Sequence, residues 1–171
     1  MFFGVSTLQT FHVLVSLVGI VSGLVVLYGL LTSQRMSTLT AIFLATTLVT
    51  TLTGFLFPIT VFTPALGVGV ISTLVMIVAL LARYPRRMRG PWRAIYVVTA
   101  VLSLYLNVFV LVVQLFLKVP ALNALAPNGS EPPLAVAQGL VLLFFVVTGY
   151  LAVRRFHPVG AFGRAAAQGN P

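Results

Sequence analysis

Residues 36–82 read MSTLTAIFLATTLVTTLTGFLFPITVFTPALGVGVISTLVMIVALLA and contain no Lys, Arg, Asp or Glu. A membrane-spanning helix needs about 20 apolar residues, so this run is long enough for two spans. Pro58 and Pro64 interrupt it, and proline removes a backbone donor and disfavours helix at the preceding residue. The run therefore predicts two helices, at about 38–57 and 64–82, joined by a tight turn from Phe57 to Thr63.

Three further runs lack charged residues, and each is long enough for one span: 1–34, 94–117 and 132–153. They do not alternate between apolar and polar residues as β-barrel strands do. The sequence therefore predicts an all-α integral membrane protein, a bundle of five transmembrane helices at about 8–32, 38–57, 64–82, 93–118 and 134–153. Residues 1–157 form one transmembrane domain, followed by a short disordered cytoplasmic tail at 158–171.

The composition excludes an ordinary soluble domain. Of the 171 residues, 60% are hydrophobic and only 6% are charged, whereas a soluble domain carries about a quarter charged residues. Glu131 is the only acidic residue, and Asp and Cys are absent. This composition excludes disulfides and catalysis by paired carboxylates or an Asp-containing triad. It also excludes a metal site built from several carboxylates. An enzyme is the least favoured class, and no cofactor or metal is predicted.

The basic residues predict an orientation in the membrane. Loops on one side hold nine of them: Arg35, Arg83, Arg86, Arg87, Arg89, Arg93, Arg154, Arg155 and Arg164. The other side holds only Lys118. Since Lys and Arg in short loops favour the cytoplasmic side, we expect the N-terminus outside and the C-terminus in the cytoplasm. The brevity of the chain and its loops favours a multi-pass protein of a bacterial inner membrane.

The loop between the third and fourth spans has the densest charge. It anchors the topology by the positive-inside rule, or it recognises anionic lipid headgroups, at about 1 kcal/mol per basic residue near the surface. Topological anchoring is the simpler interpretation. Nucleic-acid binding is not expected, because so short a loop offers no recognition element. The residues concerned are Arg83, Arg86, Arg87, Arg89 and Arg93.

Polar and small residues form stripes along two of the predicted helices. In the first helix His12, Ser16, Gly19 and Gly23 share one face, and the two glycines let another helix come close. The fourth helix carries a longer stripe: Tyr96, Ala100, Ser103, Asn107, Val110 and Gln114. Helix packing is the favoured role for Ser16, Gly19, Gly23 and Ser103. Asn107 lies roughly 16 Å from Lys118, near the membrane midplane, so its amide needs a partner on another helix.

Several polar residues lie at similar depth in the outer half of the predicted bundle. An ionisable residue within a span indicates function by default, and His12 is such a residue unless it reaches the outer headgroups. Threonine often bonds its own helix, so part of the Thr-rich second helix satisfies itself. If the helices bring these side chains together, they form a ligand-binding pocket from His12, Asn107, Gln114, Gln138, Thr50, Thr51 and Thr53.

The loop at 118–133 offers two local signals. Asn128-Gly129-Ser130 matches a glycosylation acceptor, but Asn-Gly is equally an ordinary turn, which we favour. Glu131 has Lys118 or a protonated His12 as candidate partners.

Three functions from different classes are consistent with these residues. The first is a binding module that holds a lipid or a quinone-like molecule in the outer-half pocket. The second is an accessory or structural subunit of a larger membrane complex, and the third is a passive pore or uncoupled transporter formed by an oligomer. Haem bound by His12 and a second ligand from elsewhere is a less favoured alternative. The expected partners are the lipid bilayer and either another membrane protein or further copies of the chain, not nucleic acid.

Overall fold

The computed structural model describes residues 7–57 and 64–157, and these residues are helical with no strand. The elements are α1 (Thr7–Leu31), α2 (Ser37–Gly54), α3 (Pro64–Arg83), α4 (Trp92–Lys118), α5 (Pro120–Asn123) and α6 (Pro132–Arg155). All but the short α5 are long and apolar enough to cross a membrane. The prediction of a helical bundle with five candidate spans is confirmed. Most of the predicted 57–63 turn and the whole 158–171 tail lie outside the described residues.

Three helix ends differ from the predicted positions by two or three residues: the end of α2, the start of α6 and the end of α6, which lies at Arg155 rather than 153. The first two have local reasons. α2 ends at Gly54, three residues early, because the backbone N–H groups of Phe55 and Leu56 bond to carbonyls three residues back. Such bonds tighten the last turn of a helix. α6 begins at Pro132 rather than 134, since proline suits the first helical turn, where its missing N–H costs nothing.

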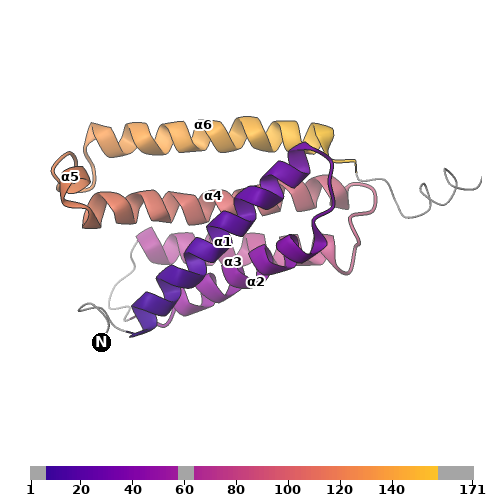
Figure 1. Ribbon diagram of the computed structural model, residues 1–171, viewed down its shortest axis with the longest axis horizontal. Coiled ribbons are helices and arrows are strands. Elements are labelled where there is room, and N and C mark those ends of the chain that lie inside the picture. The colour runs from indigo at the N-terminus through magenta and orange to yellow at the C-terminus, as the bar shows by residue number, and fades with distance from the viewer. Residues whose placement is uncertain (1–6, 58–63, 158–171) are drawn as a thin grey trace, which may run out of the picture.

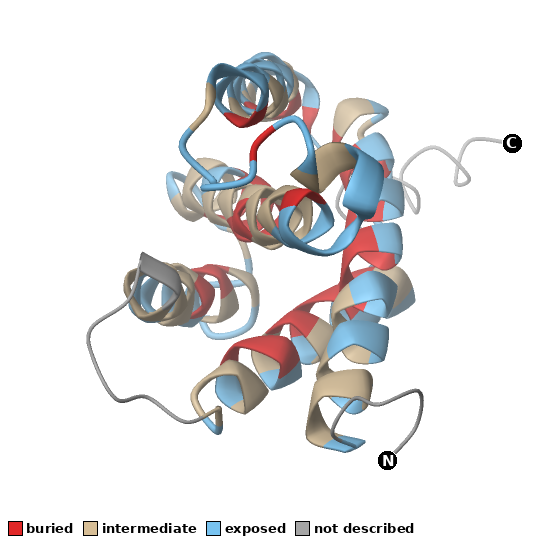
Figure 2. Cartoon of the chain, turned by 90° about the vertical axis from the view of Figure 1, so that its left-hand side faces the viewer, coloured by how far each residue is buried: buried red, intermediate tan, exposed pale blue. Residues whose placement is uncertain are grey.

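The helices form an antiparallel bundle in which α4 is central. α3 and α6 both pack along α4, whereas α1 packs most extensively on α2. α4 and α6 lie side by side, and α1 runs obliquely across the bundle (Figure 1). Seen along the bundle from the end that holds α5, buried residues line the helix faces that turn inward (Figure 2).

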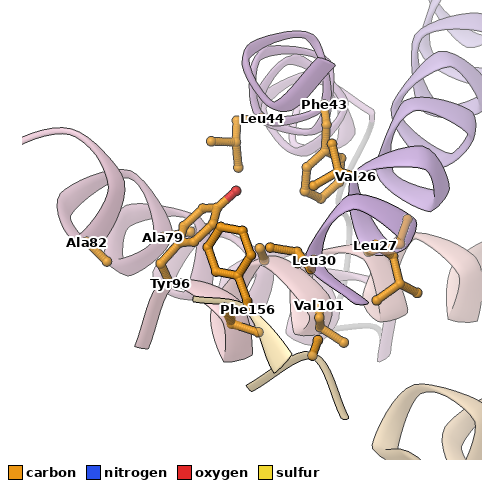
Figure 3. Close-up of a cluster of buried hydrophobic side chains, with 14 of the residues drawn as sticks. Val26, Leu27, Leu30, Phe43, Leu44, Ala79, Ala82, Tyr96, Val101 and Phe156 are labelled. Carbon is orange, nitrogen blue, oxygen red and sulfur yellow. The ribbon is translucent and has the colours of Figure 1, made fainter. Parts of the chain in front are cut away.

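The apolar core lies in the half of the bundle where α1 ends and α4 begins. It joins α1, α2, α3, α4 and α6, together with Phe156 just beyond α6 (Figure 3). Tyr96, Phe43 and Phe156 are the largest side chains in it, and each is 1% exposed. This half of the bundle is therefore filled by side chains.

Gly19 and Gly23 lie where α1 meets α2 most closely. A Cβ on Gly23 would lie 2.6 Å from Leu104 Cδ1 and 2.9 Å from the Phe43 ring. A Cβ on Gly19 would lie 3.2 Å from Thr46 Oγ1. The missing side chains thus allow the close approach that the Gly-xxx-Gly spacing predicts.

Gly23→Ala should destabilise the bundle, because Leu104 and Phe43 are buried and have no room to move away. Overpacking of this kind typically costs about 1–3 kcal/mol. We expect a corresponding fall in the free energy of unfolding, measured by circular dichroism in mild detergent. Gly139→Ala is the matched control, since a Cβ on Gly139 meets nothing within 4 Å. Equal stability of the two variants would contradict the close approach.

The last turn of α6 is tied to two distant parts of the chain. Arg93, in the first turn of α4, donates from Nη1 to the carbonyl oxygens of Val153 and Phe156. The backbone N–H of His157 donates to Ser33 Oγ at 2.9 Å. The final carbonyls of a helix lack partners within it, so Arg93 supplies partners for this end of α6.

Candidate functional site

A pocket of about 640 Å³ lies at the opposite end of the bundle from the core. Its walls come from α1, α2, α3 and α4 and are mostly apolar. The apolar part of the lining includes Leu17, Ile20, Phe55, Phe57, Leu66, Val68, Leu106, Val110, Leu111 and Leu115. Ligand sites of drug-sized molecules are typically about 300–1,000 Å³, mainly apolar, with a few placed polar groups.

Five of the seven residues of the predicted pocket line this one: His12, Thr50, Thr51, Asn107 and Gln114. They come from three helices, so their convergence depends on how α1, α2 and α4 pack. Thr53 lies beside the pocket, where its hydroxyl contacts His12. Gln138 is not part of the lining. A ligand-binding role for these residues stays a prediction.

The His12 ring forms a hydrogen bond to α2. Nδ1 lies 2.8 Å from Thr53 Oγ1. Thr53 Oγ1 also lies 2.8 Å from the Val49 carbonyl oxygen of its own helix. When the Thr53 hydroxyl donates to that carbonyl, it accepts from Nδ1–H of His12. Nε2 has no partner among the described residues.

Aromatic and small residues hold the His12 ring in place. The Phe57 ring meets it edge to face, with centroids 5.3 Å apart. On the α2 side, the imidazole Cε1 lies 3.7 Å from where a Cβ on Gly54 would be, an ordinary van der Waals distance. The ring is thus packed between Phe57 and α2 in the pocket wall.

Asn107 makes the interhelical hydrogen bond that its depth required. Its Nδ2 donates to Thr47 Oγ1 on α2 at 3.1 Å. The carbonyl oxygen of the same amide receives no hydrogen bond from the described residues. Asn107 therefore fixes α4 against α2 and still presents one acceptor at the pocket.

Thr50 is the α2 threonine whose buried hydroxyl has no partner among the described residues. Thr46, Thr51 and Thr53 each donate to the carbonyl oxygen four residues back, as expected for threonine in a helix. Thr50 is 8% exposed and lines the pocket, yet its Oγ1 has no partner in the described part of the chain. A buried hydroxyl without a partner costs about 1–3 kcal/mol, so this group is available to a ligand.

The outer end of the pocket has polar groups from α4. Gln114 and Lys118 lie one helical turn apart, both line the pocket, and neither side chain bonds to a described residue. Gln9, Ser16 and Ser72 also line it and were not among the predicted pocket residues. The spacing of Gly69 and Ser72 places both on one face of α3, a signal that could have indicated this wall.

Gln138 lies between α6 and α4, away from the pocket. Its Nε2 donates to the Phe109 carbonyl oxygen at 3.0 Å, and its Oε1 is buried without a partner. Depth along a helix was the only basis for grouping Gln138 with the pocket residues. The rotation of α6 about its axis decides which neighbour the side chain meets, and depth does not specify that rotation.

The four residues predicted to pack helices together, on α1 and α4, do not all lie between helices. Ser16 lines the pocket and bonds to the Val13 carbonyl oxygen, whereas Gly19 and Gly23 face α2. Ser103 is buried on α4, and its hydroxyl has no partner among the described residues.

Glu131 does not pair with Lys118 or His12, contrary to the pairings considered from the sequence. Its Oε1 accepts from the backbone N–H of Asn128 at 2.9 Å and from Asn128 Nδ2 at 2.7 Å. Its Oε2 accepts from the Ser130 N–H at 3.0 Å. Gly129, with φ +72°, completes an ordinary Asn-Gly turn.

The hydrogen bonds of this turn, above all that from the Asn128 backbone N–H, lower the pKa of the Glu131 carboxyl. A lowered pKa means that the ionised form stabilises the folded turn. That contribution is fully present above the ordinary carboxyl pKa and is lost as the pH falls through the lowered value.

Glu131→Gln should loosen this turn at neutral pH, because a neutral amide accepts more weakly than a carboxylate. The backbone N–H groups of Asn128 and Ser130 should exchange with deuterium faster than in the wild type, relative to their intrinsic rates. Well below the ordinary carboxyl pKa, the exchange rates of these N–H groups, relative to their intrinsic rates, should become equal in the two proteins. A difference that persists unchanged into acid would contradict the role of the charge.

The arginines of the 83–93 loop have separate contacts. The guanidinium of Arg83 lies over the Tyr96 ring at 5.3 Å, and that of Arg86 over the Trp92 ring at 4.9 Å. Arg93 holds the end of α6, a role that the sequence did not indicate. The side chains of Arg87 and Arg89 are exposed and bond to no described residue. Recognition of lipid headgroups by this loop stays a prediction.

No protein family, curated protein or solved structure matches this sequence. Within residues 7–57 and 64–157, no three His, Cys, Asp or Glu side chains come together as a metal-binding group would.

Proposed function

We propose that this protein spans a bacterial inner membrane five times and binds an amphipathic or apolar small molecule, lipid or quinone-like, in the pocket between α1, α2, α3 and α4. The observation that carries the proposal is the pocket itself, where a few polar groups from α1, α2, α3 and α4 line a mostly apolar cavity. The buried Thr50 hydroxyl, which has no partner among the described residues, supports it. It would gain a hydrogen bond from a polar group of a ligand.

The position of the core favours a binding pocket over a passage through one copy. The half of the bundle beyond the pocket is filled by buried side chains such as Phe43, Tyr96 and Leu104. A molecule that enters the pocket therefore meets a closed end. A pore would need a path between copies, and an accessory role would need a partner protein.

The orientation follows from the loops at the two ends. The end with the core holds eight described basic residues in its loops and helix ends, and the pocket end holds Lys118. By the positive-inside rule the core end faces the cytoplasm. The pocket then lies in the outer half of the membrane.

The orientation is tested by labelling of single introduced cysteines. The sequence contains no Cys of its own, so only the introduced residue can react. Ala124→Cys, in the exposed loop after α5, should react with a membrane-impermeant maleimide added to intact cells. Arg89→Cys, in the exposed loop at the other end, should react only after the membrane is opened. The reverse pattern would place the pocket on the cytoplasmic side.

Ligand retention is tested by native mass spectrometry of the protein released from mild detergent. The wild type should carry a stoichiometric adduct other than mixed bulk phospholipid. Gln114→Leu and Asn107→Leu should lower its occupancy by about tenfold or more, as expected from the loss of one hydrogen bond to a ligand in apolar surroundings.

Gln138→Leu is the matched control, because it removes the same amide from the same bundle away from the pocket. It should retain the adduct. Thermal unfolding of each variant checks that the fold persists, above all for Asn107→Leu, which also loses the bond to Thr47. Equal occupancy in all variants, or a bare wild-type chain, would overturn the proposal and favour an accessory role.

A further inference from the structure

The outer rim of the pocket is basic and has no acidic counterpart. Lys118 is the one cationic Lys or Arg in the lining, and His12 lies in the same lining with one unbonded ring nitrogen. No carboxylate lines the pocket. A polar molecule at this rim therefore meets one positive charge and several hydrogen-bond donors.

The chain provides no side-chain carboxylate to neutralise Lys118. Its only acidic side chain, Glu131, has both oxygens occupied by the Asn128–Ser130 turn. Lys118 makes no ion pair within the described residues. The Lys118 side chain is exposed at the pocket rim, so its ammonium is accessible to an anion that enters the pocket.

The side chains around Lys118 suit an anionic head above an apolar body. Gln114 lies one turn further in on the same face of α4, so its amide N–H and the Lys118 ammonium can donate to one acceptor group. Deeper in the pocket the α4 wall is mostly apolar, with Leu111 and Val110 lining it before Asn107. From rim to interior α4 thus presents a charge, a hydrogen-bond donor and then a mainly hydrocarbon wall that ends at one amide.

We propose, on the basis of the binding function above, that the ligand is an amphiphile whose polar end is a carboxylate or phosphate held by Lys118 and Gln114. A lysine in the last turn of a helix also interacts favourably with the helix dipole. That purely structural role predicts a change in stability but no preference among ligands. A preference for anionic over neutral ligands therefore distinguishes binding of a ligand by Lys118 from a purely structural role.

The test measures binding of matched probes by native mass spectrometry. Hexadecanoate is compared with hexadecanol, and phosphatidylglycerol with phosphatidylcholine, each added to the detergent-solubilised protein. The wild type should prefer the anionic member of at least one pair by about tenfold or more. Preference for hexadecanoate identifies a free fatty acid as the source, and preference for phosphatidylglycerol identifies a lipid headgroup.

Variants of Lys118 test whether the preference for anionic probes arises in the pocket. Lys118→Gln should abolish the preference by weakening binding of the anionic probe by about tenfold or more, and Lys118→Arg should keep the preference. Arg87→Gln removes the same charge at the opposite end and controls for nonspecific attraction to a chain of net charge +9. It should leave the preference intact.

Two negative results have different meanings. Equal binding of charged and neutral probes by the wild type, or a preference that survives Lys118→Gln, would overturn the anionic head but leave the pocket as a binding site. Failure of every probe to bind would overturn the proposed function and this inference together.

Discussion

The hydrogen bond from Asn107 to Thr47 separates the two halves of this bundle. It joins the Asn107 amide of α4 to the Thr47 hydroxyl of α2 at 3.1 Å, and the Thr47 side chain is buried. On one side of it, Gly23 allows Phe43 and Leu104 to meet, and the space between the helices is filled. On the other side the helices leave the pocket. The bond thus sets the depth at which packing stops and the cavity begins.

The sequence predicted the helices well because their signal is local. Runs without charge specify a span by length alone, and the stripe on α4 correctly required a partner for Asn107. The pocket depends on more than length. His12, Thr50 and Asn107 meet because α1, α2 and α4 are each rotated about their own axes to face one another. The spacing of polar residues limits these rotations but does not specify them.

The residues that sequence reasoning misplaced illustrate the same limit. Gln138 has the right depth, yet α6 turns it toward the Phe109 carbonyl. Arg93 was grouped with its neighbours by charge, whereas its position opposite the end of α6 gives it a distinct role. In both cases the missing information is which helix lies alongside, a tertiary choice that one sequence leaves open.

The contacts at the end of α6 have a consequence for biosynthesis. Arg93 and Ser33 are made early in translation, but their partners at Val153, Phe156 and His157 emerge only after all five long helices have been synthesised. Until then Arg93 and Ser33 lack these partners. The contacts that complete this end of the bundle therefore form last, once the chain carries all five long helices.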